Sequence, residues 1–177
     1  MGLNPAAPDP SGEVGGDLGV ALAYVAALGG DDPAAVVELV GDDFRNEHHA
    51  ELGSGCVGRE EYARRLPGFF ATFADRRYDV VEAAIGALVR PDPDPGRSAA
   101  SDVGRGSDTG SDTGAVDGAE AGSEVVVRYR FGADVDGVRI DIPGVMWISV
   151  RDGRVARRLD CWDSLTFHRQ TGTAPSP

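Results

Sequence analysis

The chain has 177 residues, of which 41% are hydrophobic, and a formal net charge of -12 at pH 7. This length and hydrophobic content support one domain with a substantial core rather than two domains. The acidic charge argues against nucleic acid and anionic lipid as partners, because both require basic surfaces, and no run of about 18 apolar residues is present to span a membrane.

Residues 1–16 are rich in Gly, Pro and Asp, and we interpret them as a flexible N-terminal tail. They lack the basic start and apolar centre of a secretory signal, so the expected location is the cytoplasm. Cys56 and Cys161 do not form a Cys-x-x-Cys pair. We therefore expect two reduced thiols rather than a disulfide framework or a zinc site.

Two helices are predicted next. Apolar residues recur at helical spacing from Asp17 to Leu28, and the pair Gly29-Gly30 ends that helix. Asp32 has the residue type of a helix N-cap, and Pro33 suits the first turn of a second, shorter helix.

A short strand and a third helix follow. The segment from Asp43 to His49 is predicted to be the strand. After a Gly-rich loop, the segment from Arg59 to Phe73 places most of its aromatic residues on one face, which predicts an amphipathic helix with a kink at Pro67.

The rest of the chain has the pattern of strands. Alternating and apolar runs predict strands over residues 78–89, 125–131, 138–150 and 155–163. Asp136-Gly137 is a strong hairpin signal, and residues 151–154 predict a second turn. The order of elements indicates an α+β fold, in which a curved, mainly antiparallel sheet wraps around three N-terminal helices and leaves an internal pocket.

Residues 91–122 interrupt this pattern. They contain seven acidic residues, only Arg97 and Arg105 as bases, and no aromatic residue. Such a segment buries too little apolar surface to offset the entropy of ordering, so we expect a disordered acidic insertion. One domain over residues 17–165 is thus predicted, interrupted at 91–122 and followed by a C-terminal tail over 166–177.

His48 is the most informative candidate for a functional residue. If its segment is a strand, Phe44 and Asn46 share its face and His49 points to the opposite side. A titratable imidazole then lies beside apolar packing. The pattern fits either a catalytic histidine or a core histidine whose hydrogen bonds are satisfied.

Four phrases of the sequence carry a family resemblance. They are YVAALGGDDPAAVVELVGDDF, GREEY, DIPGVMWISVRDGRV and CWDSL, in this order along the chain. They resemble the nuclear transport factor 2-like superfamily, in particular its SnoaL-like and ketosteroid-isomerase-like branches. The resemblance implies a cone-shaped α+β barrel with an apolar cavity, commonly a homodimer, in a superfamily that contains both enzymes and non-catalytic binding modules.

The isomerase branch implies roles for three positions. There a Tyr on the first helix stabilises the developing enolate, a carboxylate on the first strand moves the proton, and a protonated carboxylic acid on a later strand completes the oxyanion site. By this resemblance Tyr24 takes the place of the Tyr and His48 that of the base. Gly144 stands where the second acid belongs and has no side chain to donate. The loss of one donor costs roughly 2.7–4 kcal/mol of transition-state stabilisation, so an identical steroid isomerase is not expected.

Further pocket residues follow from strand parity and the helical face. If Trp162 faces inward, as the resemblance implies, Asp160 and Arg158 share its face. Asp160 then orients His48 or acts as a second acid, or else it only pairs with an arginine near the sheet rim. Tyr62 is expected mainly in helix packing, with its hydroxyl near the cavity mouth, and Phe69 in the apolar wall.

Two hypotheses remain open from the sequence. The first is a cofactor-independent isomerase, cyclase or hydratase with catalytic His48, Tyr24 and Asp160, and a small apolar or polyketide-like substrate bound by Phe44, Asn46, Tyr62, Phe69 and Trp162. The second is a non-catalytic module that binds an apolar ligand or serves for dimerisation. Neither a metal nor a cofactor is expected, because no third well-spaced ligand joins His48 and no phosphate-binding loop is present.

Overall fold

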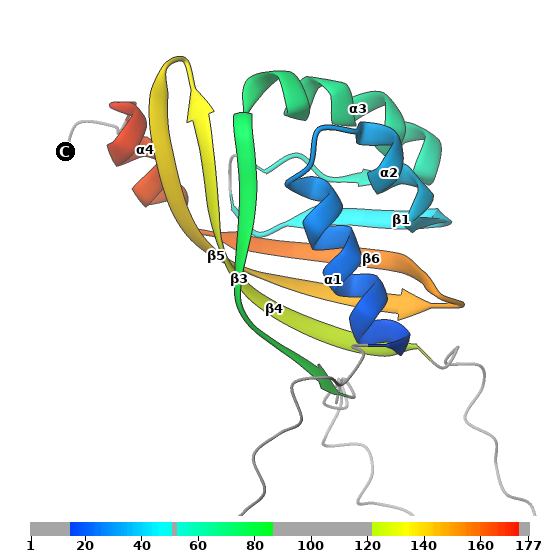
Figure 1. The fold of residues 1–177 in the computed structure, drawn as a ribbon. Helices are drawn as coiled ribbons and strands as arrows, with labels where there is room; N and C mark the ends of the chain where they lie inside the picture. Colours follow the sequence, from blue (N-terminus) through cyan, green and yellow to red (C-terminus); the bar gives the residue numbers. More distant parts are fainter. Residues whose placement is uncertain (1–14, 51–52, 87–121, 174–177) are drawn as a thin grey trace, which may run out of the picture.

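The fold consists of four helices and one six-stranded sheet (Figure 1). The computed structural model describes residues 15–50, 53–86 and 122–173. In chain order the elements are α1 (Gly16–Leu28), α2 (Pro33–Glu38), β1 (Val40–His48), β2 (Cys56–Val57), α3 (Arg59–Thr72), β3 (Ala74–Gly86), β4 (Ser123–Val135), β5 (Val138–Arg151), β6 (Arg154–Trp162) and α4 (Ser164–Thr171). All but residue 122 of the expected acidic insertion, and all but residues 15–16 of the expected N-terminal tail, lie outside the described residues.

The sheet has the strand order β2-β1-β6-β5-β4-β3. Neighbouring strands are antiparallel except β1 and β6, which are parallel. Figure 1 shows the sheet curving around α1, α2 and α3, which cover its concave face. The predicted α+β class is confirmed, but within the described residues the sheet ends at β2 and β3 and does not close into the expected barrel.

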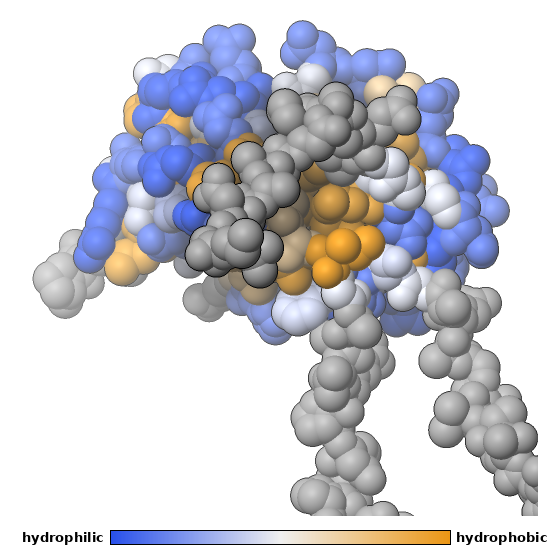
Figure 2. Space-filling model, turned by 60° about the horizontal axis from the view of Figure 1, so that its bottom comes forward, coloured by the Kyte–Doolittle hydropathy of each residue, from blue (hydrophilic) through white to orange (hydrophobic). Residues whose placement is uncertain are grey.

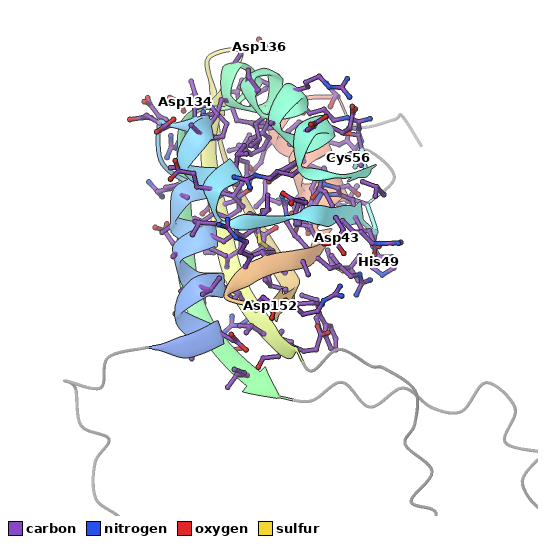
Figure 3. All side chains as sticks on the ribbon, turned by 90° about the vertical axis from the view of Figure 1, so that its right-hand side faces the viewer. Asp43, His49, Cys56, Asp134, Asp136 and Asp152 are labelled. Atoms are coloured by element: carbon purple, nitrogen blue, oxygen red, sulfur yellow. The ribbon has the colours of Figure 1, made fainter. Side chains whose placement is uncertain are left out.

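The predicted helix boundaries and turns follow from their local chemistry. The Asp32 carboxylate accepts a hydrogen bond from the Ala34 amide at 2.9 Å and caps α2. Asp136 and Gly137 have φ angles of 49° and 80°, as a two-residue hairpin turn between β4 and β5 requires. Asp152, with φ 51°, begins the corresponding turn between β5 and β6. Figure 3 shows Asp136 and Asp152 at opposite ends of the sheet.

The segments that differ from the sequence predictions include the first strand and the region after residue 165. The first strand begins at Val40 rather than Asp43, because the backbone of Val40 pairs with that of Val155 on β6 and its side chain is fully buried. The expected tail after residue 165 instead begins with α4, which is capped by the Asp163 carboxylate and packs against β5. The Gln170 side chain fixes this packing by bonding both backbone groups of Asp141.

The core fills the space between α1 and the sheet. Its largest fully buried side chains include Tyr24, Leu28, Phe44, Ile142 and Met146. None of the described helices is long and apolar enough to cross a membrane. Figure 2 shows the lower face of the molecule, where a hydrophobic area lies within a mainly hydrophilic surface.

Candidate active site

A cavity of about 580 Å³ lies between the helices and the concave face of the sheet. Apolar and aromatic side chains dominate its wall, with a small polar group at one side. Its lining includes Asn46, His48, Tyr62, Phe69, Tyr78, Tyr129, Phe131, Arg158, Asp160, Trp162 and Phe167. A mainly apolar cavity with a few convergent polar groups is the usual form of a small-molecule site.

His48 and Asn46 present their side chains to the cavity from β1, as strand parity predicts. The Asn46 Nδ2 lies 3.3 Å from the His48 Nε2, which places an N–H beside a ring nitrogen. If Nε2 accepts this bond, the ring proton resides on Nδ1. Nδ1 has no hydrogen-bond partner among the described residues. The long contact with Asn46 therefore orients the ring while leaving the Nε2 lone pair only weakly engaged.

The environment of His48 keeps its imidazole neutral. Burial, reinforced by the positive charge of Arg158, lowers the pKa of His48 from 6.5 to about 4, although Asp160 opposes the shift. This pKa lies below that of an exposed histidine, which titrates near neutral pH. His48 therefore stays unprotonated throughout the neutral pH range, and it is a weaker base than an exposed histidine.

Tyr24 does not line the cavity. Its side chain is fully buried, and its hydroxyl lies 2.8 Å from that of Tyr62, which does line the cavity. Burial raises the pKa of both tyrosines, so both hydroxyls stay protonated. The hydroxyl available to a bound molecule is thus that of Tyr62, with Tyr24 behind it.

Asp160 lies in a buried network rather than at the sheet rim. Its side chain is paired with the Arg158 guanidinium and accepts a 2.6 Å hydrogen bond from the Tyr129 hydroxyl. Arg158 is 5% exposed and Asp160 3% exposed. Of the roles considered from the sequence, the pairing with Arg158 is the one that the structure contains. No hydrogen bond joins Asp160 to the His48 ring among the described residues.

Gly144 makes room for Tyr129. The two residues are register partners on β5 and β4, and a Cβ atom at position 144 would overlap the Tyr129 ring and hydroxyl. A side chain at 144 would therefore displace the hydroxyl that bonds Asp160. The position that lacks an acid in the sequence is occupied in space by a tyrosine.

Aromatic residues form part of the cavity wall. Phe69, Phe73 and Phe131 contact one another, with ring centroids 5.1–6.2 Å apart. Trp162 packs edge-on against Phe167 of α4 at 5.8 Å. The predicted positions of Phe69 and Trp162 in the cavity wall are thus observed, although their roles in binding stay predictions.

Phe44, in contrast, does not line the cavity. It is fully buried, with its ring centroid 4.7 Å from that of Tyr62 and 6.2 Å from that of Tyr24. Its expected contact with substrate is not supported by this position. Phe44 supports the tyrosine pair from behind.

The family model of the SnoaL-like domain matches residues 21–90, from α1 into and beyond β3. The fold described above agrees with this match. Over these residues the chain is similar to SnoaL-like domains. The predicted resemblance to the nuclear transport factor 2-like superfamily is confirmed, and no curated protein matches the sequence.

Solved structures share this fold at low identity. A protein of ketosteroid isomerase-like fold from Catenulispora acidiphila DSM 44928, in complex with trimethylamine, superposes with a TM-score of 0.60 at 16% identity, over 89% of this chain and 97% of that one. A protein described as a SnoaL-like polyketide cyclase from Shewanella denitrificans OS-217 gives 0.59 at 14%, over 88% and 96%. An LEH-like epoxide hydrolase of M. tuberculosis gives 0.56 at 18%, over 87% and 88%. At these identities the similarity shows the fold alone.

Sequence reasoning missed several residues that line the cavity. Tyr129 is one of them, because strand parity shows which residues share a face but not which face is concave. Arg158 was expected on the same face as Trp162, with no role beyond pairing with Asp160. Phe167 lay in the expected tail, and the Asp163 cap before it was the available signal for a helix. Among the described residues, no group of three His, Cys, Asp or Glu side chains is arranged to hold a metal ion.

Proposed function

We propose that this protein is a cofactor-independent isomerase, cyclase or hydratase that acts on a small, largely apolar molecule. His48 serves as the general base, and the hydroxyl of Tyr62, supported by Tyr24, stabilises the developing oxyanion. The observation that carries the proposal is that His48 and Tyr62 line one mainly apolar cavity. The resemblance predicted that Tyr24 donates to the oxyanion directly. In this proposal Tyr24 acts only indirectly, through its 2.8 Å contact with Tyr62.

The lowered pKa of His48 is compatible with this role. With a pKa of about 4, the imidazole carries its lone pair at every pH in the neutral range. Ketosteroid isomerase uses an aspartate base whose pKa is only modestly raised. A weak base suffices when the oxyanion site stabilises the carbanion that forms.

The comparisons support a small-molecule ligand. Structural neighbours include proteins described as polyketide cyclases and an epoxide hydrolase, and the protein TerC was crystallised with polyporic acid. These proteins share the fold described here, and the cavity of this chain has the apolar lining that such molecules require.

A non-catalytic binding module is the second candidate. A base is most effective when its pKa lies near the working pH, and that of His48 is about 4. Gly144 also removes the second acid of the isomerase pattern. In this alternative the cavity binds an apolar ligand, and His48 only fills its wall.

Turnover of a panel of cyclic enones and polyketide-like substrates by wild type and His48→Ala separates the two candidates. The expected loss of kcat in His48→Ala is roughly 10²–10⁴-fold, the usual contribution of a general base. His49→Ala is the matched control, because His49 follows His48 directly, does not line the cavity and lies at the edge of the ribbon in Figure 3. Equal rates in wild type and His48→Ala would exclude His48 as the base.

The outer face of the sheet supports a homodimer as part of the proposal. It carries Val145 and Trp147, both partly buried, beside Val81, which is 47% exposed. Trp147→Glu is expected to convert a dimer to a monomer in light scattering after gel filtration. Val57→Glu, at the β2 edge, is the control, and a monomeric wild type would contradict the assembly.

A further inference from the structure

Among the described residues, Arg158 is the only positive charge that lines the cavity from the sheet. Arg64 and Arg65 line it from α3, where both pair with Glu61. Arg158 comes from β6, where its register partner on β1 is Asn46, and the next inward residue, Asp160, is the register partner of His48. Arg158 therefore lies on the strand next to the two cavity-lining polar residues of β1. Its charge reaches His48, since it contributes to the lowered pKa of that residue after burial.

The Arg158 guanidinium has unused capacity to donate. It is bonded to one oxygen of Asp160 and also acts on the Tyr24 hydroxyl, whose pKa it lowers against the larger effect of burial, whereas its Nε has no hydrogen-bond partner among the described residues. A guanidinium carries five N–H donors in a fixed plane. Asp160 is held from its other side by the Tyr129 hydroxyl, so the carboxylate fixes the orientation of Arg158 without occupying all its donors.

We propose that Arg158 is the second oxyanion donor of this cavity, in place of the acid that Gly144 cannot supply, and that the substrate is a neutral carbonyl compound. This inference rests on the proposed function and names its substrate class. Arg158 and Tyr62 both line the cavity, so a carbonyl oxygen between them receives donors from β6 and α3.

The three candidate reactions share an enolate. In an isomerisation or cyclisation, His48 Nε2 takes a proton from the carbon beside the carbonyl, and the electron pair of the broken C–H bond moves to the oxygen. In a hydration, His48 takes a proton from water as its oxygen adds to a conjugated enone, and the electron pair of the C=C bond moves to the same carbonyl oxygen. In each case Arg158 receives the negative oxygen, and His48 later returns its proton.

The charges in the cavity select a neutral substrate. Before the reaction His48 is neutral, and Arg158 and Asp160 cancel each other. After proton transfer the new positive charge on His48 balances the enolate, so the total remains zero. A carboxylate substrate would add an unbalanced negative charge beside Asp160, which a buried site disfavours.

Two isosteric probes test this proposal by binding alone. They are 2-acetylnaphthalene, a neutral ketone labelled with ¹³C at its carbonyl, and 2-naphthoate, in which a negative oxygen replaces the methyl group. In wild type the ketone is expected to bind at least tenfold more tightly than the carboxylate. The C=O stretch of the bound ketone is expected at a lower infrared frequency than in an apolar solvent.

Three variants locate the donor. Arg158→Met/Asp160→Asn removes both charges together, so the C=O frequency should return toward the apolar-solvent value and the dissociation constant of the ketone should rise about tenfold. Asp160→Asn alone leaves Arg158 unopposed, so binding of 2-naphthoate should strengthen by at least tenfold. Arg128→Gln, which breaks an exposed ion pair on the outer face, is the control that should change neither.

The infrared spectrum of the ketone bound to wild type tests the proposal even if a variant does not fold. An unshifted C=O band, failure of the ketone to bind, or equal binding of 2-naphthoate would each overturn the proposal. So would a band shift that survives Arg158→Met/Asp160→Asn and disappears in Tyr62→Phe. These measurements need no turnover, so a His48→Ala variant with unchanged activity would refute the proposed base while leaving the role of Arg158 to be decided separately.

Discussion

Two consecutive arginines on β6 face opposite sides of the sheet. Arg158 points to the cavity and pairs with Asp160, where the two side chains are 7% and 4% exposed. Arg157 points to the outer face and pairs with Glu47 at 2.6 Å, where the side chains are 26% and 39% exposed. The residue types are alike, and burial is what differs.

Burial changes what an ion pair does. The outer pair lies near water, where attraction is screened and contributes little to stability. The inner pair has lost its hydration, so each charge depends on the other and on Tyr129. The inner charges also act on their neighbours, since Arg158 and Asp160 influence the pKa of His48 in opposite directions. Strand β6 therefore contributes to two ion pairs: a weak one on the outer face, and one that orients side chains in the cavity.

The largest expected effect comes from breaking the inner pair. Asp160→Ala leaves the Arg158 charge buried without its partner, and we expect a loss of about 3–5 kcal/mol in the free energy of unfolding. Urea denaturation followed by circular dichroism measures this loss. A loss below 1 kcal/mol would show that Arg158 finds water or another acceptor, and the contrast between the two faces would fail.

The pH dependence of His48 tests how far the buried charges act. The pKa is about 4 in the folded protein and 6.5 in the reference state. Between these values the unfolded chain binds the extra proton, so stability is complete above pH 6.5 and falls as pH decreases toward 4. The loss is on the order of 2–3 kcal/mol.

The free energy of unfolding of wild type and of His48→Gln, measured by denaturation between pH 4 and 7, gives the contribution of His48 to this pH dependence. The slope contributed by His48 should disappear in the variant. It should persist in His49→Gln, because that side chain lies outside the cavity. An NMR titration that placed the pKa of His48 above 6 would contradict the desolvated environment of the inner face.

Gly144→Ala tests the packing that holds the inner pair. The added methyl group overlaps Tyr129, so the tyrosine must move and its bond to Asp160 is lost. We expect a loss of about 1–3 kcal/mol in the free energy of unfolding. Gly86→Ala is the matched control, because a Cβ at Gly86 meets no atom within 4 Å. An equal response of the two variants would show that Tyr129 moves without cost.

Much of the cavity was predictable from local rules, and the rest depends on how the sheet curves. Period-two alternation placed Asn46 with His48, and Asp160 with Trp162, and the structure brings both pairs to the cavity. Alternation does not say which face of β4 is concave, so Tyr129 remained undetermined. The sequence showed that Gly144 lacks a side chain, but only the β4–β5 register shows that Tyr129 uses its space. Likewise, the family resemblance placed Tyr24 at the oxyanion site, and only the structure shows that Tyr62 lines the cavity with Tyr24 behind it.

The smallest expected effect comes from breaking the outer pair. Arg157 donates two hydrogen bonds to the Glu47 carboxylate, at 2.6 and 3.0 Å, and this pairing lowers the pKa of Glu47. Glu47→Gln should nevertheless cost only about 0–1 kcal/mol, because partly exposed charges regain hydration when separated. The difference between wild type and Glu47→Gln should shrink further in 1 M salt, where the Debye length is about 3 Å. A loss as large as that of Asp160→Ala would mean that the outer face is covered in solution, which the proposed homodimer explains and a monomer does not.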